Sequence, residues 1–242
     1  MSPRTTTATS ARVLMQLRHD PRTVAMLLVV PSLLMTLLWW IYDGGPLFDL
    51  VGPALLAIFP FLVMFLVTSI ATLRERTSGT LERLLSMPTG KVDFLLGYAL
   101  AFGVVALVQA ALTASVAVGL LDMRAVGPTW ILVAVAVFDA LLGVALGLFV
   151  SAFAATEFQV VQFMPALILP QFLLCGLLVP RDELPGVLEP ISDVLPLSYA
   201  VDAMREVQAV ADPSVTGDLA VVVGFSLALL AFGAATLRRR TP

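Results

Sequence analysis

Residues 50–73 read LVGPALLAIFPFLVMFLVTSIATL, and the charged residues Arg74, Glu75 and Arg76 follow directly. All 24 residues of this run are uncharged. A bilayer-crossing helix needs about 20 predominantly apolar residues, because about 30 Å of hydrocarbon is covered at 1.5 Å per residue. The run therefore predicts a membrane-spanning helix that ends where the charged residues begin.

Five other stretches of the chain meet the same criterion. The predicted spans are, in chain order, 24–42, 50–73, 94–121, 129–155, 159–179 and 219–237. The composition agrees, because 59% of the 242 residues are apolar and 13% are charged, against about 25% charged in soluble proteins. The mean hydropathy is +0.98. A soluble enzyme, a disordered chain and a nucleic-acid-binding protein are excluded, and the predicted class is an all-α integral membrane protein, with one transmembrane domain over residues 1–242.

The basic residues are unevenly placed. Eleven of the fourteen lie near the two termini or between the second and third spans, and the other three are Arg124, Arg181 and Arg205. Because cytoplasmic segments carry the excess of basic residues, this pattern predicts that both termini are cytoplasmic. Arginine greatly outnumbers lysine, and Ala, Val and Leu are abundant, which is typical of high-GC bacterial genomes. The predicted location is the bacterial plasma membrane.

Residues 10–19, ahead of the first span, have an amphipathic pattern. Leu14 and Leu17 share one helical face, whereas Arg18 lies elsewhere. Ser10 suits the N-cap of such a helix, and the next helix begins with Asp20 as N-cap and proline at its first position. A basic amphipathic helix of this kind lies in the inner interface, in contact with membrane lipids. It serves either as a plain anchor or as part of a docking surface.

A second amphipathic segment, residues 78–86, lies between the second and third spans. Leu81, Leu84 and Leu85 share one face, Glu82 and Arg83 point away from it, and Pro88 ends the helix. A passive hairpin between two spans needs no such helix. We interpret it as a cytoplasmic helix that docks a soluble partner.

Residues 181–210 form a proline-broken segment on the predicted outer side. Helical spacing predicts two short pieces, the second over residues 199–210 with Ser198 as its cap. Neither is long enough to cross a bilayer. We expect re-entrant half-helices that dip into the outer leaflet or cap the bundle, where protein shields their broken backbone.

Prolines within the second and fifth spans remove backbone hydrogen bonds and favour kinks. A functional interpretation is that these two spans bend to line a translocation path, and the alternative is an apolar surface that faces lipid. The aromatic and methionine residues assigned to the path are Phe59, Phe61, Phe65, Phe163, Met164 and Phe172.

Asp139 is the only acid at membrane depth. Asp139 shares one helical face with Gly143, Gly147 and Ser151, because these residues are spaced four apart. The two glycines form a G-x-x-x-G pattern that favours close helix packing. We expect a structural role in which Asp139 is hydrogen-bonded to the third span, toward Gln109 or Thr113. The alternative is a proton or cation site, because a charged acid inside the membrane costs free energy and commonly marks a functional site.

The sequence contains no recognised catalytic or metal-binding pattern. The chain has one Cys and one His, so neither a disulfide nor a histidine-based metal site is expected. Thr89-Gly90-Lys91 lacks the upstream glycine and the following hydroxyl of a phosphate-binding loop. No catalytic residue is predicted, and active transport would take its energy from a partner or an ion gradient.

Three motifs together resemble a known family. ERTSGTLERLL at residues 75–85 is similar to the E-R-x-x-G-T-L-E coupling loop of ABC-2 type permeases, and LPLSYAVDAMR at residues 195–205 is similar to the outer segment of that family. RHDPR at residues 18–22 matches the beginning of its first span. The usual Asn-Pro of the outer motif is Leu195-Pro196 here.

The resemblance implies the membrane subunit of an ATP-driven exporter of drugs, lipids or glycolipids, similar to daunorubicin-resistance permeases. Two permease chains would pair with two separate ATPase subunits, which bind ATP and Mg, and would export by alternating access. An outer gate would contain Tyr199, Asp202 and Arg205. The ATPase-coupling surface would comprise Leu14, Leu17, Arg18, Glu75, Gly79, Thr80, Leu81, Glu82, Arg83, Leu84 and Leu85. The alternatives are a self-sufficient secondary carrier or channel that uses Asp139 and a scaffold without transport.

Overall fold

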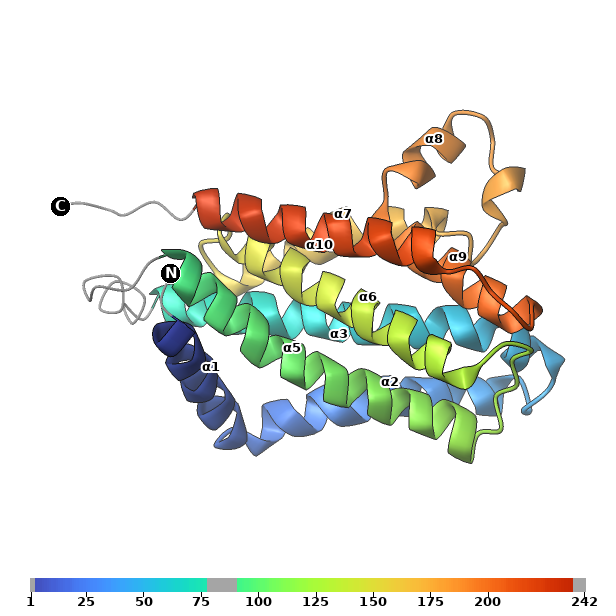
Figure 1. Ribbon diagram of the computed structural model, residues 1–242, viewed down its shortest axis with the longest axis horizontal. Helices are drawn as coiled ribbons and strands as arrows, with labels where there is room; N and C mark the ends of the chain where they lie inside the picture. The colour runs from blue at the N-terminus through green and yellow to red at the C-terminus, as the bar shows by residue number, and fades with distance from the viewer. Residues whose placement is uncertain (1–2, 78–90, 237–242) are drawn as a thin grey trace.

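A computed structural model describes residues 3–77 and 91–236, and in these ranges all regular secondary structure is helical (Figure 1). The helices are α1 (Pro3–Arg18), α2 (Pro21–Ile41), α3 (Pro46–Thr77), α5 (Lys91–Ser115) with its π-helical continuation η1 (Val116–Leu120), α6 (Thr129–Ser151), α7 (Glu157–Leu174), the 3₁₀ turn η2 (Arg181–Glu183), α8 (Leu188–Asp193), α9 (Pro196–Ala209) and α10 (Thr216–Thr236).

Six helices in the described residues are long and apolar enough to cross a membrane, namely α2, α3, α5 with η1, α6, α7 and α10. The six predicted spans and the all-α class are therefore confirmed. Figure 1 shows that α3 ends, α5 begins and α10 ends at one end of the bundle, close to α1. This end carries Arg12, Arg74 and Arg76, and we call it the basic end. Helices α8 and α9 lie at the opposite end.

Several predicted boundaries are wrong: α3 begins at Pro46 rather than at residue 50, α6 ends at Ser151 rather than at residue 155, and the ends of α3 and α7 also differ. Helix α3 continues to Thr77 rather than ending at residue 73, because its charged last turn is held by the neighbouring helices, as described below. Helix α7 ends at Leu174 rather than at residue 179. Gly176 has a φ of +89°, a left-handed conformation that glycine adopts at little cost and that commonly terminates helices.

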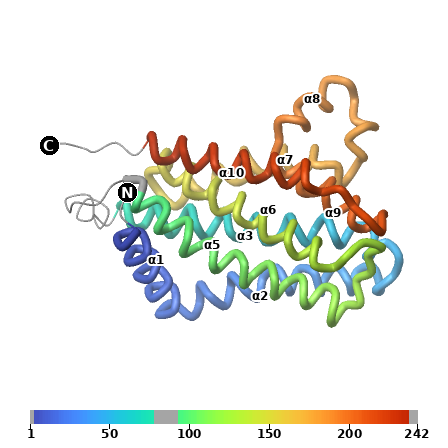
Figure 2. Tube along the Cα trace, in the orientation of Figure 1, coloured from blue at the N-terminus to red at the C-terminus, as the bar shows by residue number. Residues whose placement is uncertain are grey.

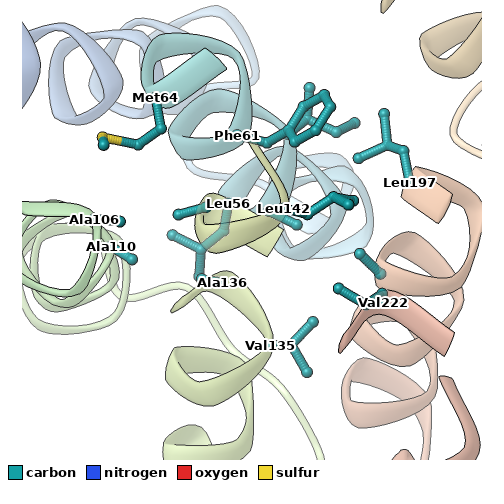
Figure 3. Packing of buried hydrophobic residues seen from close by; sticks show 14 of the residues in the cluster. Leu56, Phe61, Met64, Ala106, Ala110, Val135, Ala136, Leu142, Leu197 and Val222 are labelled. Carbon is teal, nitrogen blue, oxygen red and sulfur yellow. The ribbon is translucent and has the colours of Figure 1, made fainter. Parts of the chain in front are cut away.

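The core is built around α3 and α6. The spanning segment of α6 is 72% buried and that of α3 is 61% buried, against 11% for α10. Figure 3 shows Phe61 of α3 and Leu142 of α6 among the buried side chains, with Leu197 of α9 and Val222 of α10 on one side of them. Helices α2, α7 and α10 are left with broad exposed apolar faces.

The G-x-x-x-G face of α6 packs directly on the backbone of α3. A Cβ atom added at Gly143 would lie 2.4 Å from the carbonyl oxygen of Phe61, and one at Gly147 would lie 2.7 Å from that of Phe65. Both distances are too short for real atoms. The predicted close packing is therefore present, and its partner helix is α3.

The segment between α7 and α10 contains short helices, as expected, but they begin elsewhere. Only η2 and the six-residue α8 form before Leu195. Helix α9 begins at Pro196, which occupies its first turn. Ser198 therefore lies inside α9 and does not cap it, because proline already suits the first helical position. Figure 2 shows α8 projecting from the bundle, while α9 lies along it.

The N-terminal helix is longer than predicted. It begins at Pro3 rather than near residue 10, so Ser10 is an interior residue. Asp20 caps α2 as predicted, because its carboxylate accepts hydrogen bonds from the Thr23 backbone nitrogen at 3.2 Å and from the Thr23 hydroxyl at 2.6 Å. These bonds hold the pKa of Asp20 below its ordinary value.

Candidate functional site

At the basic end, α1 is fastened to the last turn of α3 through Glu75. The guanidinium of Arg12 pairs with the Glu75 carboxylate at 3.3 Å, and Gln16 donates a hydrogen bond to the same carboxylate at 3.0 Å. Arg12 also donates to the hydroxyl of Tyr98 in α5 at 2.9 Å. Glu75, which the sequence assigned to the coupling surface, thus joins the interfacial helix to the core.

Helix α1 also packs closely against α5. A Cβ atom at Gly97 would lie 2.6 Å from the Cβ of Thr9, so the glycine permits the close approach. Among the predicted coupling residues of α1, Leu14 and Leu17 are half-buried against the hydrophobic core, and Arg18 is exposed. The polar side of α1 is therefore left on the surface of the basic end.

The last turn of α3 is also bound to α6 and α7. Arg74 forms a bidentate ion pair with Glu157 at the start of α7, with N···O distances of 2.6 and 3.1 Å. Arg76 donates to the backbone carbonyl of Ser151, the last residue of α6. Residues 74–76 thus connect three helices at one point. Sequence reasoning missed these contacts, since it placed the charged turn in a loop.

The remaining residues of the predicted coupling surface lie outside the described residues. They are Gly79, Thr80, Leu81, Glu82, Arg83, Leu84 and Leu85. The predicted helix over residues 78–86 stays a prediction.

The residues predicted to line a translocation path do not form one group. Phe61 and Phe65 are completely buried within this single chain. Half-buried positions are occupied by Phe59, Phe163, Met164 and Phe172. In addition, α7 exposes the polar side chain of Gln162 in mid-helix, which sequence reasoning did not single out.

At the opposite end, a charge cluster is centred on Arg181. Its guanidinium forms ion pairs with Asp193 and Asp202, and its Nε donates to the Ser192 hydroxyl at 2.9 Å. The guanidinium also lies 5.0 Å from the ring centroid of Tyr199, within the range of a cation–π contact. We call these five residues the outer cluster.

Two of the three predicted gate residues, Tyr199 and Asp202, belong to the outer cluster. Arg205 does not: it donates to the Leu177 carbonyl at 3.4 Å. The cation that partners Asp202 is Arg181, which lies 21 residues earlier in the chain. Burial raises the pKa of the Asp202 carboxyl, and the hydrogen bond and charge of Arg181 act in the opposite direction.

Replacing Arg181 by alanine is expected to lower the free energy of unfolding by about 2 kcal/mol, because Asp202 loses its partner while half-buried. The segment between α7 and α9 should become more sensitive to limited proteolysis. Arg124→Ala is the matched control, since Arg124 pairs with Asp122 at 2.8 Å on an exposed surface. Equal proteolysis of the two variants would contradict a fastening role for Arg181.

The expected partners of Asp139 are wrong. Gln109 donates to the Leu27 carbonyl at 2.8 Å, and Thr113 donates to the Gln109 carbonyl at 2.9 Å. Asp139 is fully buried, and neither of its carboxyl oxygens has a hydrogen-bond partner within residues 3–77 and 91–236. The reason is that its helix face, shared with Gly143, packs against α3 and not α5.

Comparisons with known proteins agree with this architecture. A family model of ABC-2 type transporters matches residues 5–209, from α1 to the end of α9. The chain therefore belongs to the ABC-2 type transporter family and is a multi-pass membrane protein, which confirms the resemblance seen in the sequence.

Two curated relatives are similar over about two thirds of the chain. The probable multidrug ABC transporter permease YbhR of Escherichia coli K12 is 26% identical over 157 residues, which are 65% of this chain and 43% of that protein. ABC transporter G family member 20 of Dictyostelium discoideum is 24% identical over 159 residues, which are 66% of this chain and 22% of that protein. The matched region thus spans less than half of either relative.

Proposed function

We propose that the chain is the permease subunit of an ATP-driven exporter that moves a hydrophobic or amphipathic substrate, such as a drug, lipid or glycolipid, out of the cytoplasm. A separate ATP-binding subunit, in two copies, binds ATP and Mg and drives alternating access between two permease chains, identical or homologous. The permease itself catalyses no reaction. It lies in the bacterial plasma membrane with both termini in the cytoplasm.

The observation that carries the proposal is the fastening of α1 to α3 through Glu75. A soluble ATPase must move membrane helices from their ends, and this requires a rigid connection between the docking surface and the core. The ion pair of Arg12 with Glu75 supplies such a connection. Because Arg74 and Arg76 bind the same turn to α7 and α6, a displacement at the basic end would move three spans together.

The exposed face of α7 supports a second permease chain beside it. Gln162, Pro165 and Pro170 are exposed on this helix. A polar amide in hydrocarbon is costly, and each proline leaves a backbone carbonyl without its helical donor. A partner chain or an aqueous path would satisfy these groups better than lipid. At the opposite end, the outer cluster would hold an outer gate closed.

The test is to purify the chain from its native membrane in mild detergent and identify what accompanies it by mass spectrometry. We expect a soluble protein that carries a phosphate-binding loop. The ATPase should be lost when Leu81, Leu84 and Leu85 are changed to aspartate, because the apolar face of the predicted docking helix is then charged.

A matched control places three aspartates at Leu178, Val187 and Val194, exposed apolar residues near the opposite end, and should retain the ATPase. The double change Glu82→Ala and Arg83→Ala should keep the complex but stop export. The proposal would be refuted if no ATPase accompanied the wild-type chain purified from its native membrane. It would also be refuted if the variant changed at Leu81, Leu84 and Leu85 retained the ATPase.

A further inference from the structure

Asp139 lies in the middle of α6 and is fully buried without a polar partner. Neither of its carboxyl oxygens receives a hydrogen bond from any group in residues 3–77 and 91–236. An ionised carboxylate is strongly disfavoured in such a site, because nothing replaces the water that it loses, whereas the neutral acid is tolerated. The surroundings of Asp139 therefore suit the protonated side chain.

The helices packed on α6 keep most ionised groups away from Asp139. Helices α3, α5 and α7 carry charged residues only in their first or last turn, and the described part of α10 carries only Asp218, also in its first turn. Helix α9 packs on α6 as well and carries Asp202, Arg205 and Glu206 beyond its first turn. Arg205 is thus the one cation that these helices, where they are described, hold away from the basic end.

A single turn, residues 175–177, connects the surroundings of Asp139 with those of Arg205. Cys175 is buried, and both Asp139 and Arg205 are close enough to act electrostatically on its thiol. A Cβ atom at Gly176 would lie 3.7 Å from Nη1 of Arg205, and Arg205 donates to the carbonyl of Leu177 at 3.4 Å. We call residues 175–177 the α7 turn, because they follow the end of that helix.

Arg205 forms no ion pair in the described part of the chain. The nearby carboxylate of Asp202 is paired with Arg181, and the charge of Arg205 reaches it only from beyond contact distance. Glu206, next to Arg205 in sequence, accepts a backbone hydrogen bond at 2.7 Å. A fully buried acid and a half-buried cation, each without an ion-pair partner, therefore lie close to the same turn.

Water at the basic end does not reach the acid. A groove of about 570 Å³ lies there between α1, α2, α3 and α5, and no residue of α6 lines it. A smaller apolar groove between α5, α6 and α10 also excludes Asp139 from its lining. The α7 turn is thus the cover that lies between Asp139 and the charged residues of the outer end.

We propose that Asp139 is a proton-binding site whose occupancy controls the α7 turn. With the proton bound, the neutral acid is sealed in the core, as in the conformation described here. When the turn moves aside, water from the outer end takes up the proton, and the carboxylate pairs with Arg205. The closed form thus holds one proton more than the open form, so a rise in pH favours opening. This goes beyond the proposed function and depends on neither cargo nor ATPase.

The chain contains its own reporter of this opening, because Cys175 is its only cysteine. Burial raises the pKa of the thiol to about 11, so the closed form should react slowly with N-ethylmaleimide. The reaction is followed by mass spectrometry in native membranes washed free of nucleotide. Dividing each rate by that of Asp139→Asn cancels the ionisation of the thiol itself. We expect this ratio to rise about tenfold per pH unit between about pH 6 and about pH 8.

A double-mutant cycle tests the pairing of Asp139 with Arg205. Arg205→Gln keeps a donor for the Leu177 carbonyl but removes the charge. At about pH 8 it should slow labelling about tenfold more in the wild-type background than in Asp139→Asn, because only the carboxylate gains from the cation. Asp218→Asn, which removes a neighbouring carboxylate of α10, should keep the wild-type dependence on pH. Size-exclusion elution checks that each variant is folded.

A second measurement needs no variant. Dicyclohexylcarbodiimide is an apolar reagent that reacts with protonated carboxyl groups, whereas ordinary carboxyl groups are ionised at about pH 7. At that pH it should modify Asp139 of the wild-type chain, identified by peptide mass spectrometry, and should leave the exposed Asp122 unmodified. The modified chain can no longer ionise at Asp139, so its Cys175 should be labelled with the pH dependence of Asp139→Asn.

Three results would each overturn the proposal. They are a labelling ratio that does not change with pH, an equal effect of Arg205→Gln in both backgrounds, and a wild-type Asp139 that the carbodiimide leaves unmodified. None of these measurements involves ATP hydrolysis or cargo, so their failure leaves the permease assignment standing. Loss of ATPase co-purification would, in turn, leave the proton site intact.

Discussion

Replacing Gly143 by valine is expected to destabilise the folded protein by about 3 kcal/mol, at the upper end of the cost of overpacking. The reason is the contact between α6 and α3, where even a Cβ atom would lie 2.4 Å from the Phe61 carbonyl oxygen. Since that oxygen belongs to the backbone, no side-chain rotation can relieve the clash, and the two central helices must separate. Thermal unfolding in detergent, followed by size-exclusion elution, measures the loss.

The chain offers a matched control in Gly224→Val. Gly224 also lies in a spanning helix, α10, and an added Cβ atom there meets nothing within 4 Å. The same substitution should change the free energy of unfolding by no more than about 0.5 kcal/mol. If the two variants unfold at the same temperature, close packing of α3 on α6 is not what holds the bundle together.

Replacing Glu75 by alanine is expected to lower export and substrate-stimulated ATP hydrolysis at least about tenfold, which corresponds to about 1.4 kcal/mol of activation free energy. Membrane insertion and folding should persist, because the six spans and their packing are untouched. The loss follows because Arg12 and Gln16 then have no carboxylate on α3, so that a displacement of α1 no longer acts directly on the turn that binds α6 and α7. Transport into inverted vesicles that contain the reconstituted complex provides the measurement.

Two further variants decide whether the ion pair itself is responsible. Exchanging the charges, with Arg12→Glu and Glu75→Arg in one chain, should restore part of the activity, although Arg12 also bonds to Tyr98. Asp122→Ala removes an exposed ion pair and should have no effect, since both of its side chains are more than three quarters solvent-accessible. Full export by Glu75→Ala would refute a coupling role for this contact.

Much of the fold follows from local sequence. The six spans are recognisable because bilayer thickness sets the length of an apolar run, whatever the run packs against. The cap of α2 at Asp20 and the close-packing face of α6 are also readable, because each depends on residues within one or two helical turns. The ends of α3 and α7 are not, because tertiary contacts extend the first and a left-handed Gly176 stops the second.

The sites depend on contacts between distant parts of the chain. Arg12 and Glu75 are 63 residues apart in the chain. In the sequence alone, each resembles an ordinary charged residue at the membrane interface. Sequence reasoning placed Asp202 and Arg205 together in an outer gate, whereas the fold supplies Arg181 from another segment as the partner of Asp202. Likewise, Asp139 faces α3 and not the polar residues of α5.

Local sequence therefore decides which segments enter the membrane and where most helices begin, because hydrophobic length and helix capping act over a few residues. Only the tertiary structure decides which charges meet and where a groove is left open. These outcomes depend on the rotation and spacing of packed helices, and many residues far apart in the chain determine them together.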